Sequence, residues 1–180
     1  MFTIGGSVVA IVLIVLGFGI YKFNFTNDDI YLKTGGRLDS KDGTYVIDGK
    51  SVTLKDGYHE SKAAQGLASK EITRYFGNDT QGDFNNDGVY DSAFLLSQDT
   101  GGSGTFYYVV ALVSSQDKFV GTNALLIGDR IAPQTTEFRN GEIIVNYAAR
   151  QPGEPMTVSP SVGISKYFKV SGSTLVEIKK

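Results

Sequence analysis

The chain of 180 residues contains no cysteine and a single histidine, His59. The absence of cysteine excludes a disulfide framework, thiolate metal sites, a cysteine nucleophile and a lipid-modified cysteine anchor. Catalysis by a serine or cysteine nucleophile usually needs a positioned imidazole base, and only one imidazole is present. We therefore expect a non-enzymatic protein in which His59 is structural.

The chain has no excess of positive charge, and one long interval has no basic residue at all. The formal net charge is −2, so no basic field for nucleic acid is indicated and we expect no nucleic-acid partner. Between Arg74 and Lys118 there is no lysine or arginine. That interval contains six aspartates, namely Asp79, Asp83, Asp87, Asp91, Asp99 and Asp117. Carboxylates gathered without basic partners indicate a site that a cation would neutralise.

The segment Ile4–Ile20 carries no charged residue. As a helix it would span roughly 26 Å, close to the ~30 Å hydrocarbon core of a bilayer. The basic start and the small residues that precede a signal-peptidase cut are both missing, which favours an uncleaved anchor. We predict a transmembrane helix over residues 1–22 with the lipid bilayer as its partner, a stalk over residues 23–43 and a β domain over residues 44–180.

Two features of the sequence favour opposite orientations of this anchor in the membrane. Lys22, Lys33 and Arg37 follow the apolar segment and no basic residue precedes it. The positive-inside rule would therefore place the body in the cytoplasm. The acidic loop and the resemblance described below favour the outside. We predict a single-pass protein of the cytoplasmic membrane with an extracytoplasmic body, in the periplasm or at the cell surface.

The body is rich in β-prone runs separated by turn residues. Three hairpins are predicted: Thr44–Leu54 turning at Asp48-Gly49, Thr135–Tyr147 turning at Asn140-Gly141, and Lys166–Ile178 turning near Ser171 to Ser173. Phe106–Val113 is apolar on both faces, as in a central strand. Ser61–Phe76 has some helical spacing, but Gly66 and the β-prone EITRYF favour a loop followed by a strand. The expected fold is mainly β, an antiparallel β-sandwich or barrel-like domain.

The stretch GDFNNDGVYD matches an EF-hand-type calcium loop over most of its length. Counted from Asp83, the oxygen-bearing positions 1, 3, 5, 7 and 9 are Asp83, Asn85, Asp87, Val89 (through its carbonyl) and Asp91. Gly88 holds position 6, where such loops turn sharply. We predict Ca²⁺ binding by these five residues, with the weak affinity of extracellular modules. The alternative is an Asx-rich turn that bonds its own backbone.

Position 12 of this loop is Phe94, where a calcium sensor has a bidentate glutamate. A β-prone run, YDSAFLLS, follows the loop where a sensor would have a helix. The loop therefore resembles calcium loops inserted between strands, as in FG-GAP-type or dockerin-like segments. We interpret it as a static calcium staple rather than a switch.

Three weaker candidates remain open. The loop Gly101–Gly104 in GGSGTFYY resembles that of small periplasmic lysozyme inhibitors of the C-type family, which implies an inhibitor or ligand-binding module as an alternative function. The segments IGDRIAP and RQPGEP carry four charged residues: Asp129, Arg130, Arg150 and Glu154. These would form either a polar ligand site or solvated ion pairs. A hydrolase using clustered carboxylates is the least favoured reading.

From Thr44 onward the chain resembles an uncharacterised domain of bacterial membrane-anchored or secreted envelope proteins, sometimes found before a META-type domain. The resemblance rests on SKEITRYFGN, GDFNNDGVYDSAFLLSQDTGGSGTFYYVVAL, LLIGDRIAPQTTE, GEIIVNYAARQPGEPM and PSVGISKYFKV. It implies an envelope location and the acidic loop. For a domain in that location we expect an envelope protein or a glycan as partner. No catalytic residue is implied.

Overall fold

The computed structural model describes residues 39–62, 69–116 and 118–180. Within these ranges every regular element is a β-strand, and all pairings between the strands are antiparallel. The prediction of a mainly β fold is confirmed. The predicted anchor and the stalk up to residue 38 lie outside the described residues. In the described part of the chain, no helix is long and apolar enough to cross a membrane.

Twelve strands form two large sheets and one hairpin. The six-stranded sheet has the order β3-β4-β5-β6-β7 with β8 beside β6, and consists of β3 (Tyr58–Lys62), β4 (Lys70–Gly82), β5 (Asp91–Asp99), β6 (Phe106–Ser115), β7 (Lys118–Gly121) and β8 (Leu125–Asp129). The four-stranded sheet has the order β12-β11-β10-β9, from β9 (Ala132–Arg139), β10 (Glu142–Ala149), β11 (Val162–Ser171) and β12 (Thr174–Ile178). The hairpin pairs β1 (Thr44–Ile47) with β2 (Lys50–Thr53).

The turn chemistry of the sequence explains the three predicted hairpins. Asp48 and Gly49 have φ values of 48° and 79°, and Asn140 and Gly141 have 56° and 72°. Two successive positive φ values are what a type I′ turn requires, and Asx-Gly pairs adopt them most readily. Gly172, with φ of 60°, turns the third hairpin between β11 and β12. All three hairpin predictions are confirmed.

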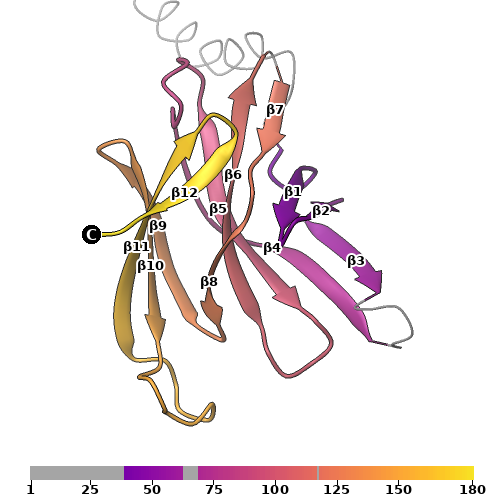
Figure 1. Cartoon of the computed structure of the whole chain (residues 1–180), viewed down its shortest axis with the longest axis vertical. Helices are drawn as coiled ribbons and strands as arrows, with labels where there is room; N and C mark the ends of the chain where they lie inside the picture. The colour runs from indigo at the N-terminus through magenta and orange to yellow at the C-terminus, as the bar shows by residue number, and fades with distance from the viewer. Residues whose placement is uncertain (1–38, 63–68, 117) are drawn as a thin grey trace, which may run out of the picture.

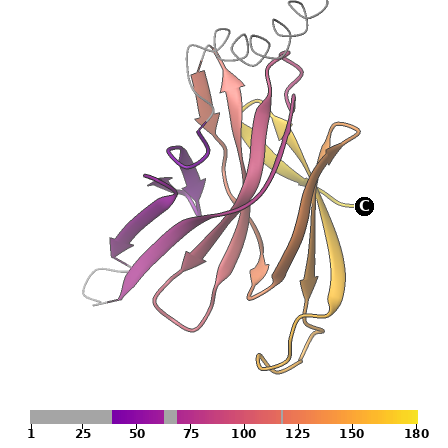
Figure 2. The same ribbon diagram turned by 180° about the vertical axis from the view of Figure 1, so that it is seen from behind.

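The six-stranded sheet is the middle layer of the molecule (Figures 1 and 2). One face packs on the four-stranded sheet through a core that includes Leu95, Val109 and Phe168. The other face packs on the β1–β2 hairpin through a second core that includes Tyr45 and Phe94. Because both faces are covered, nearly all of β5 and β6 is buried. The predicted central strand over Phe106–Val113 is therefore confirmed.

The strand β4 bends halfway along its length. Its first half pairs with β3 and confirms the strand predicted for EITRYF. Of the loop predicted before it, Ser61 and Lys62 belong instead to β3, and residues 63–68 lie outside the described ranges. The register with β5 shifts on both sides of Gly77, whose φ is 100°. Beyond the bend, Gly82 lies against the ring of Phe138 on β9, so closely that an added Cβ would come within 2.3 Å of that ring.

A side-chain bridge joins the two large sheets near their edge. Asn123, between β7 and β8, donates from Nδ2 to the carbonyl of Leu175 at 3.1 Å and accepts the Leu175 N–H at 2.8 Å. The Asn123 side-chain amide thus makes with Leu175 the pair of hydrogen bonds that the backbone of an adjacent strand would make.

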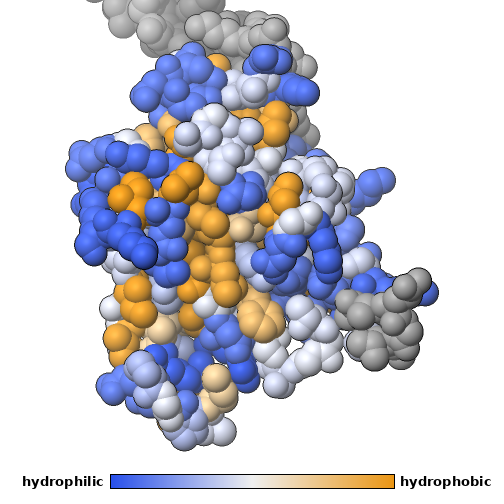
Figure 3. Space-filling view, in the orientation of Figure 1, coloured by the Kyte–Doolittle hydropathy of each residue, from blue (hydrophilic) through white to orange (hydrophobic). Residues whose placement is uncertain are grey.

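Figure 3 shows hydrophobic side chains gathered along the middle of one face, between the four-stranded sheet and β8, with hydrophilic side chains on either side.

Candidate functional sites

The acidic loop connects β4 to β5 and is held by hydrogen bonds from its own backbone. The N–H groups of Asp87 and Gly88 donate to the two oxygens of Asp83, at 3.0 and 2.9 Å. The Asp87 N–H also reaches Asn85 Oδ1 at 3.1 Å, and the Val89 N–H reaches Asp87 Oδ1 at 2.8 Å. Gly88 has φ of 83°, which only glycine adopts freely, so the sharp turn falls at the predicted position 6.

Asp91 occupies a different environment from the rest of the loop. It is the first residue of β5 and is fully buried. Its two oxygens accept the N–H groups of Phe84 and Ser114, both at 2.8 Å, so it joins the loop to β6. Burial raises the pKa of Asp91 to about 6 despite these hydrogen bonds. The sequence predicted a calcium ligand at this position, and the structure shows that Asp91 also holds the loop to β6 by hydrogen bonds, a role we call the Asp91 pin.

The exposed Asp87 has the opposite shift. Burial alone would raise its pKa, but hydrogen bonds, that of the Val89 N–H first among them, hold it below its ordinary value. None of the ion pairs among the described residues includes a carboxylate of this loop. Each carboxylate has about four lone-pair sites, so one or two N–H bonds leave room for a cation.

The structure separates the loop from a calcium sensor. Phe94, at position 12, is fully buried in the core beneath the β1–β2 hairpin and offers no ligand. The strand β5 begins at Asp91, as predicted, and no helix follows. Among the described residues, no three His, Cys, Asp or Glu side chains converge as a metal-binding group.

The glycine-rich loop Gly101–Gly104 forms the turn between β5 and β6. Gly101 has φ of 84°, and its N–H donates to Asp99 Oδ1 at 2.8 Å. Gly102 has no neighbouring atom within 4 Å of an added Cβ, so the tip of the turn stands in open space. The arrangement is an exposed hairpin turn and holds no phosphate-binding helix.

The two charged segments singled out in the sequence do meet in space. Arg150 Nη1 donates to the carbonyl of Arg130 at 2.7 Å, and Arg130 pairs with Asp129 at 2.6 Å. The Arg130 guanidinium lowers the pKa of the Asp129 carboxyl. Glu154 Oε2 accepts the Gln151 N–H at 2.8 Å. These segments border a hollow of about 330 Å³, but their charged groups are bonded to one another or to backbone.

His59 lies on β3 with its Nδ1 2.9 Å from the carbonyl of Thr53. The bond ties the edge strand to β2, which agrees with the structural role expected for this residue. The sequence could not indicate this partner, because the contact joins a hairpin to a different sheet.

Aspartates other than those of the loop gather around a polar hollow of about 500 Å³. Its lining includes Asp39, Asp42, Asp56 and Asp79. Asp42 Oδ1 accepts the Asp56 N–H at 3.1 Å, and Asp79 accepts the hydroxyl of Tyr75. Burial first, then the hydrogen bond to Asp79, raises the pKa of Tyr75. A carboxylate-based hydrolase would have its acids here, and the sequence did not single out this group.

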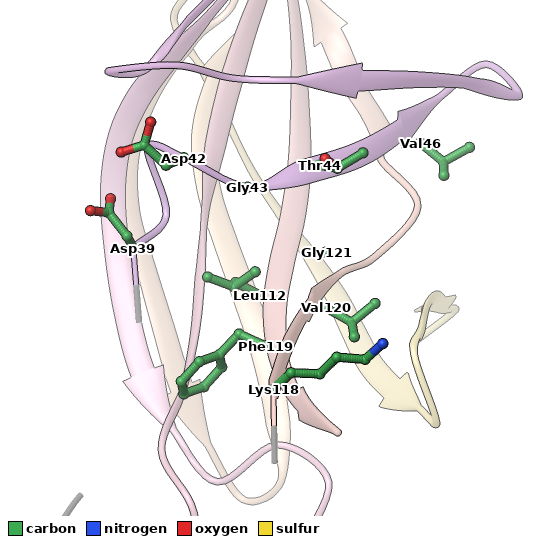
Figure 4. A pocket seen from close by; sticks show the side chains of 10 residues that line it. All are labelled: Asp39, Asp42, Gly43, Thr44, Val46, Leu112, Lys118, Phe119, Val120 and Gly121. Carbon is green, nitrogen blue, oxygen red and sulfur yellow. The ribbon is translucent and has the colours of Figure 1, made fainter. Parts of the chain in front are cut away.

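A second hollow, of about 650 Å³, lies between the segment before β1 and the strand β7. Figure 4 shows Asp39 and Asp42 at one end and Lys118 at the other, with Leu112 and Phe119 between them. Residues 39–43, expected in the stalk, lie against the domain here: the Leu54 N–H donates to the carbonyl of Gly43 at 2.9 Å. The lining of this hollow combines charged and apolar side chains, and this combination does not indicate any one class of ligand.

Comparisons with protein-family models, with curated proteins and with solved structures find no match to this chain. The resemblance to an envelope domain family therefore stays a prediction.

Proposed function

We propose that this chain is a non-enzymatic β domain of the bacterial cell envelope in which calcium closes the loop Asp83–Asp91. In this proposal residues 1–22 anchor it in the cytoplasmic membrane and the sandwich-like body lies outside the cytoplasm. Its role is binding or structural.

The observation that supports calcium most strongly is the arrangement of oxygens in the loop. Asp83, Asn85 and Asp87 belong to one tight turn, and the N–H groups of that turn bond their side chains. Such bonds fix the side chains before a metal arrives, which reduces the entropy that binding must overcome. The carboxylates have no basic partner, so a divalent cation would relieve their repulsion.

The calcium affinity that we expect of this loop, ~10⁻⁴ to 10⁻³ M, is typical of extracellular modules and would suit an extracytoplasmic body. A binding or structural role is preferred to catalysis for a simple reason. The one histidine contacts a backbone carbonyl, and the aspartates of the loop are engaged in building a turn. Neither arrangement supplies the paired acid and base that hydrolysis requires. In the hollow that four other aspartates line, Asp42 accepts the Asp56 N–H and Asp79 accepts the Tyr75 hydroxyl, bonds that also hold the fold together.

Thermal unfolding of the full-length chain with calcium and with a chelator tests the proposal. With a dissociation constant of ~10⁻⁴ to 10⁻³ M, 5 mM calcium stabilises the folded state by about 1–2 kcal/mol. For a domain of this size the midpoint should rise by about 3–8 °C relative to excess EDTA. Circular dichroism at 218 nm follows the loss of strand structure.

A substitution within the loop separates calcium binding from general salt effects. Asp87→Asn removes one ligand charge but keeps an oxygen for the Val89 N–H, so the melt in EDTA should change little. Its calcium-dependent rise should be mostly lost. Glu137→Gln, which neutralises an exposed carboxylate on β9, is the matched control and should keep the full rise. An unchanged wild-type midpoint at 5 mM calcium would leave the loop as an Asx-rich turn.

A further inference from the structure

One row of side chains crosses four strands of the six-stranded sheet. The register pairs Tyr58 with Arg74, Arg74 with Ser97, and Ser97 with Tyr107. Directly opposed residues in antiparallel strands project from the same face, so these four side chains form a line. Three strand spacings of ~4.8 Å make the line roughly 14 Å long. Gly128 on β8 pairs with Tyr107, but the side chain of Ile131 lies within 2.7 Å of where its Cβ would stand, so the row ends at Tyr107.

An exposed aromatic ring lies near each end of this row: Tyr58 at one end, and at the other Phe76, beside Tyr107, which is itself partly buried against the core. Tyr58 is 41% exposed, and Phe76, whose ring centroid lies 5.2 Å from that of Tyr107, is 43% exposed. Figures 1 and 2 show β3 and the adjoining half of β4 on the side away from the four-stranded sheet, so among the described residues that sheet covers the Tyr107 end of the face and not the Tyr58 end. Exposed rings on a rigid sheet form a ready-made binding surface, because little side-chain freedom is lost when a ligand docks.

The charges around the row are paired within the described part of the domain, except that of Arg74. Glu60 pairs with Lys70 at 2.7 Å and accepts the hydroxyl of Tyr58 at 2.8 Å. The Arg74 guanidinium carbon lies 5.5 Å from the centre of the Tyr58 ring, a cation–π contact. A polyanion such as nucleic acid needs several cations along its track. The row offers one, so its charge suits a neutral ligand with hydroxyl groups that Arg74 and Ser97 can bond.

We propose that the row Tyr58–Arg74–Ser97–Tyr107, together with Phe76, binds a neutral β-linked oligosaccharide. A sugar ring has a flat C–H face that packs on an aromatic ring and a rim of hydroxyls that bonds Arg74 and Ser97. A β-1,4-linked chain is extended, so its rings can follow a straight line across the strands. This inference rests on the proposed binding role of the domain, but it uses none of the calcium ligands.

Isothermal titration calorimetry tests the proposal. The full-length chain is held in phosphatidylcholine nanodiscs or in a detergent without a sugar headgroup. Cellohexaose and chitohexaose are the β-1,4-linked probes, maltohexaose is the α-linked comparison, and a ten-nucleotide oligothymidine is the polyanion comparison. We expect binding of at least one β-1,4-linked probe that is tighter than that of both comparisons. We expect it equally in 5 mM calcium and in EDTA, so its failure is distinct from failure of the calcium melt.

Two variants with a matched control identify the surface. Tyr58→Ala and Phe76→Ala should each weaken binding about fivefold, the effect of losing one aromatic contact. Tyr167→Ala is the control, because its ring also carries a cation, Lys180 at 4.3 Å, but lies on the four-stranded sheet. Either exposed-ring variant suffices if the other unfolds. Absence of β-linked binding at 10 mM probe, equal loss in the control, or preference for maltohexaose or oligothymidine would each overturn the proposal.

Discussion

The pKa of Asp91 leads to a pH dependence that can be measured on the metal-free protein. A carboxyl group whose pKa is about 6 in the folded chain and 3.8 in the unfolded chain binds its proton more tightly when folded. The free energy of unfolding contributed by this group therefore falls as the pH rises from about 4 to about 6. The difference of about 2 pH units corresponds to about 3 kcal/mol.

Asp91→Asn isolates this contribution, since the other carboxyl groups titrate alike in both proteins. The asparagine is never charged, and its single oxygen can accept one of the two N–H groups, from Phe84 or Ser114, that Asp91 accepts. The unpaired donor lowers the stability of the variant by about 1–3 kcal/mol at every pH. This offset moves the whole stability curve of the variant and leaves its slope unchanged.

Urea unfolding in excess EDTA at pH 4, 5, 6 and 7 gives the two curves. Wild type should be the more stable protein at pH 4, and its advantage over Asp91→Asn should shrink by about 2–2.5 kcal/mol between pH 4 and pH 7. Most of the change should occur between pH 4 and 6. Parallel curves over this range would show that Asp91 titrates with an ordinary pKa. The conclusion that burial raises its pKa would then be wrong.

The remaining predictions concern the join between the sheets and the orientation of the chain. Asn123→Ala leaves the N–H and C=O of Leu175 without their partners, so the free energy of unfolding should fall by about 2–3 kcal/mol; a loss below about 0.5 kcal/mol in urea unfolding would contradict this account of the bridge. External protease should digest the body of the full-length chain in spheroplasts, whereas protection would place that body in the cytoplasm.

Local features of the fold could be predicted because short-range chemistry determines them. Asp48-Gly49 and Asn140-Gly141 both adopt the positive φ values that were expected from residue type alone. Phe106–Val113 is apolar on both faces because two other layers cover it, and that pattern is visible in the sequence. Such signals lie within a few residues of one another.

The partners of candidate site residues could not be predicted, because they depend on strand register. Asp91 was expected as a ligand at position 9, but its bond to the Ser114 N–H joins residues 23 positions apart. The row from Tyr58 to Tyr107 likewise draws one residue from each of four strands. Before the order of the strands is known, Tyr58 and Tyr107 are recognisable only as residues that favour β-strands.

The pin at Asp91 also bears on the aromatic row, through the register of β5. Ser97 lies six residues along β5 from Asp91, roughly 20 Å at ~3.4 Å per residue, so the two do not touch. A slip of β5 by one residue would turn Ser97 to the opposite face and break the row. The bonds of Asp91 to Phe84 and Ser114 oppose that slip, and they form without a metal. The row should therefore persist in EDTA, and it should depend on Asp91 more than on calcium.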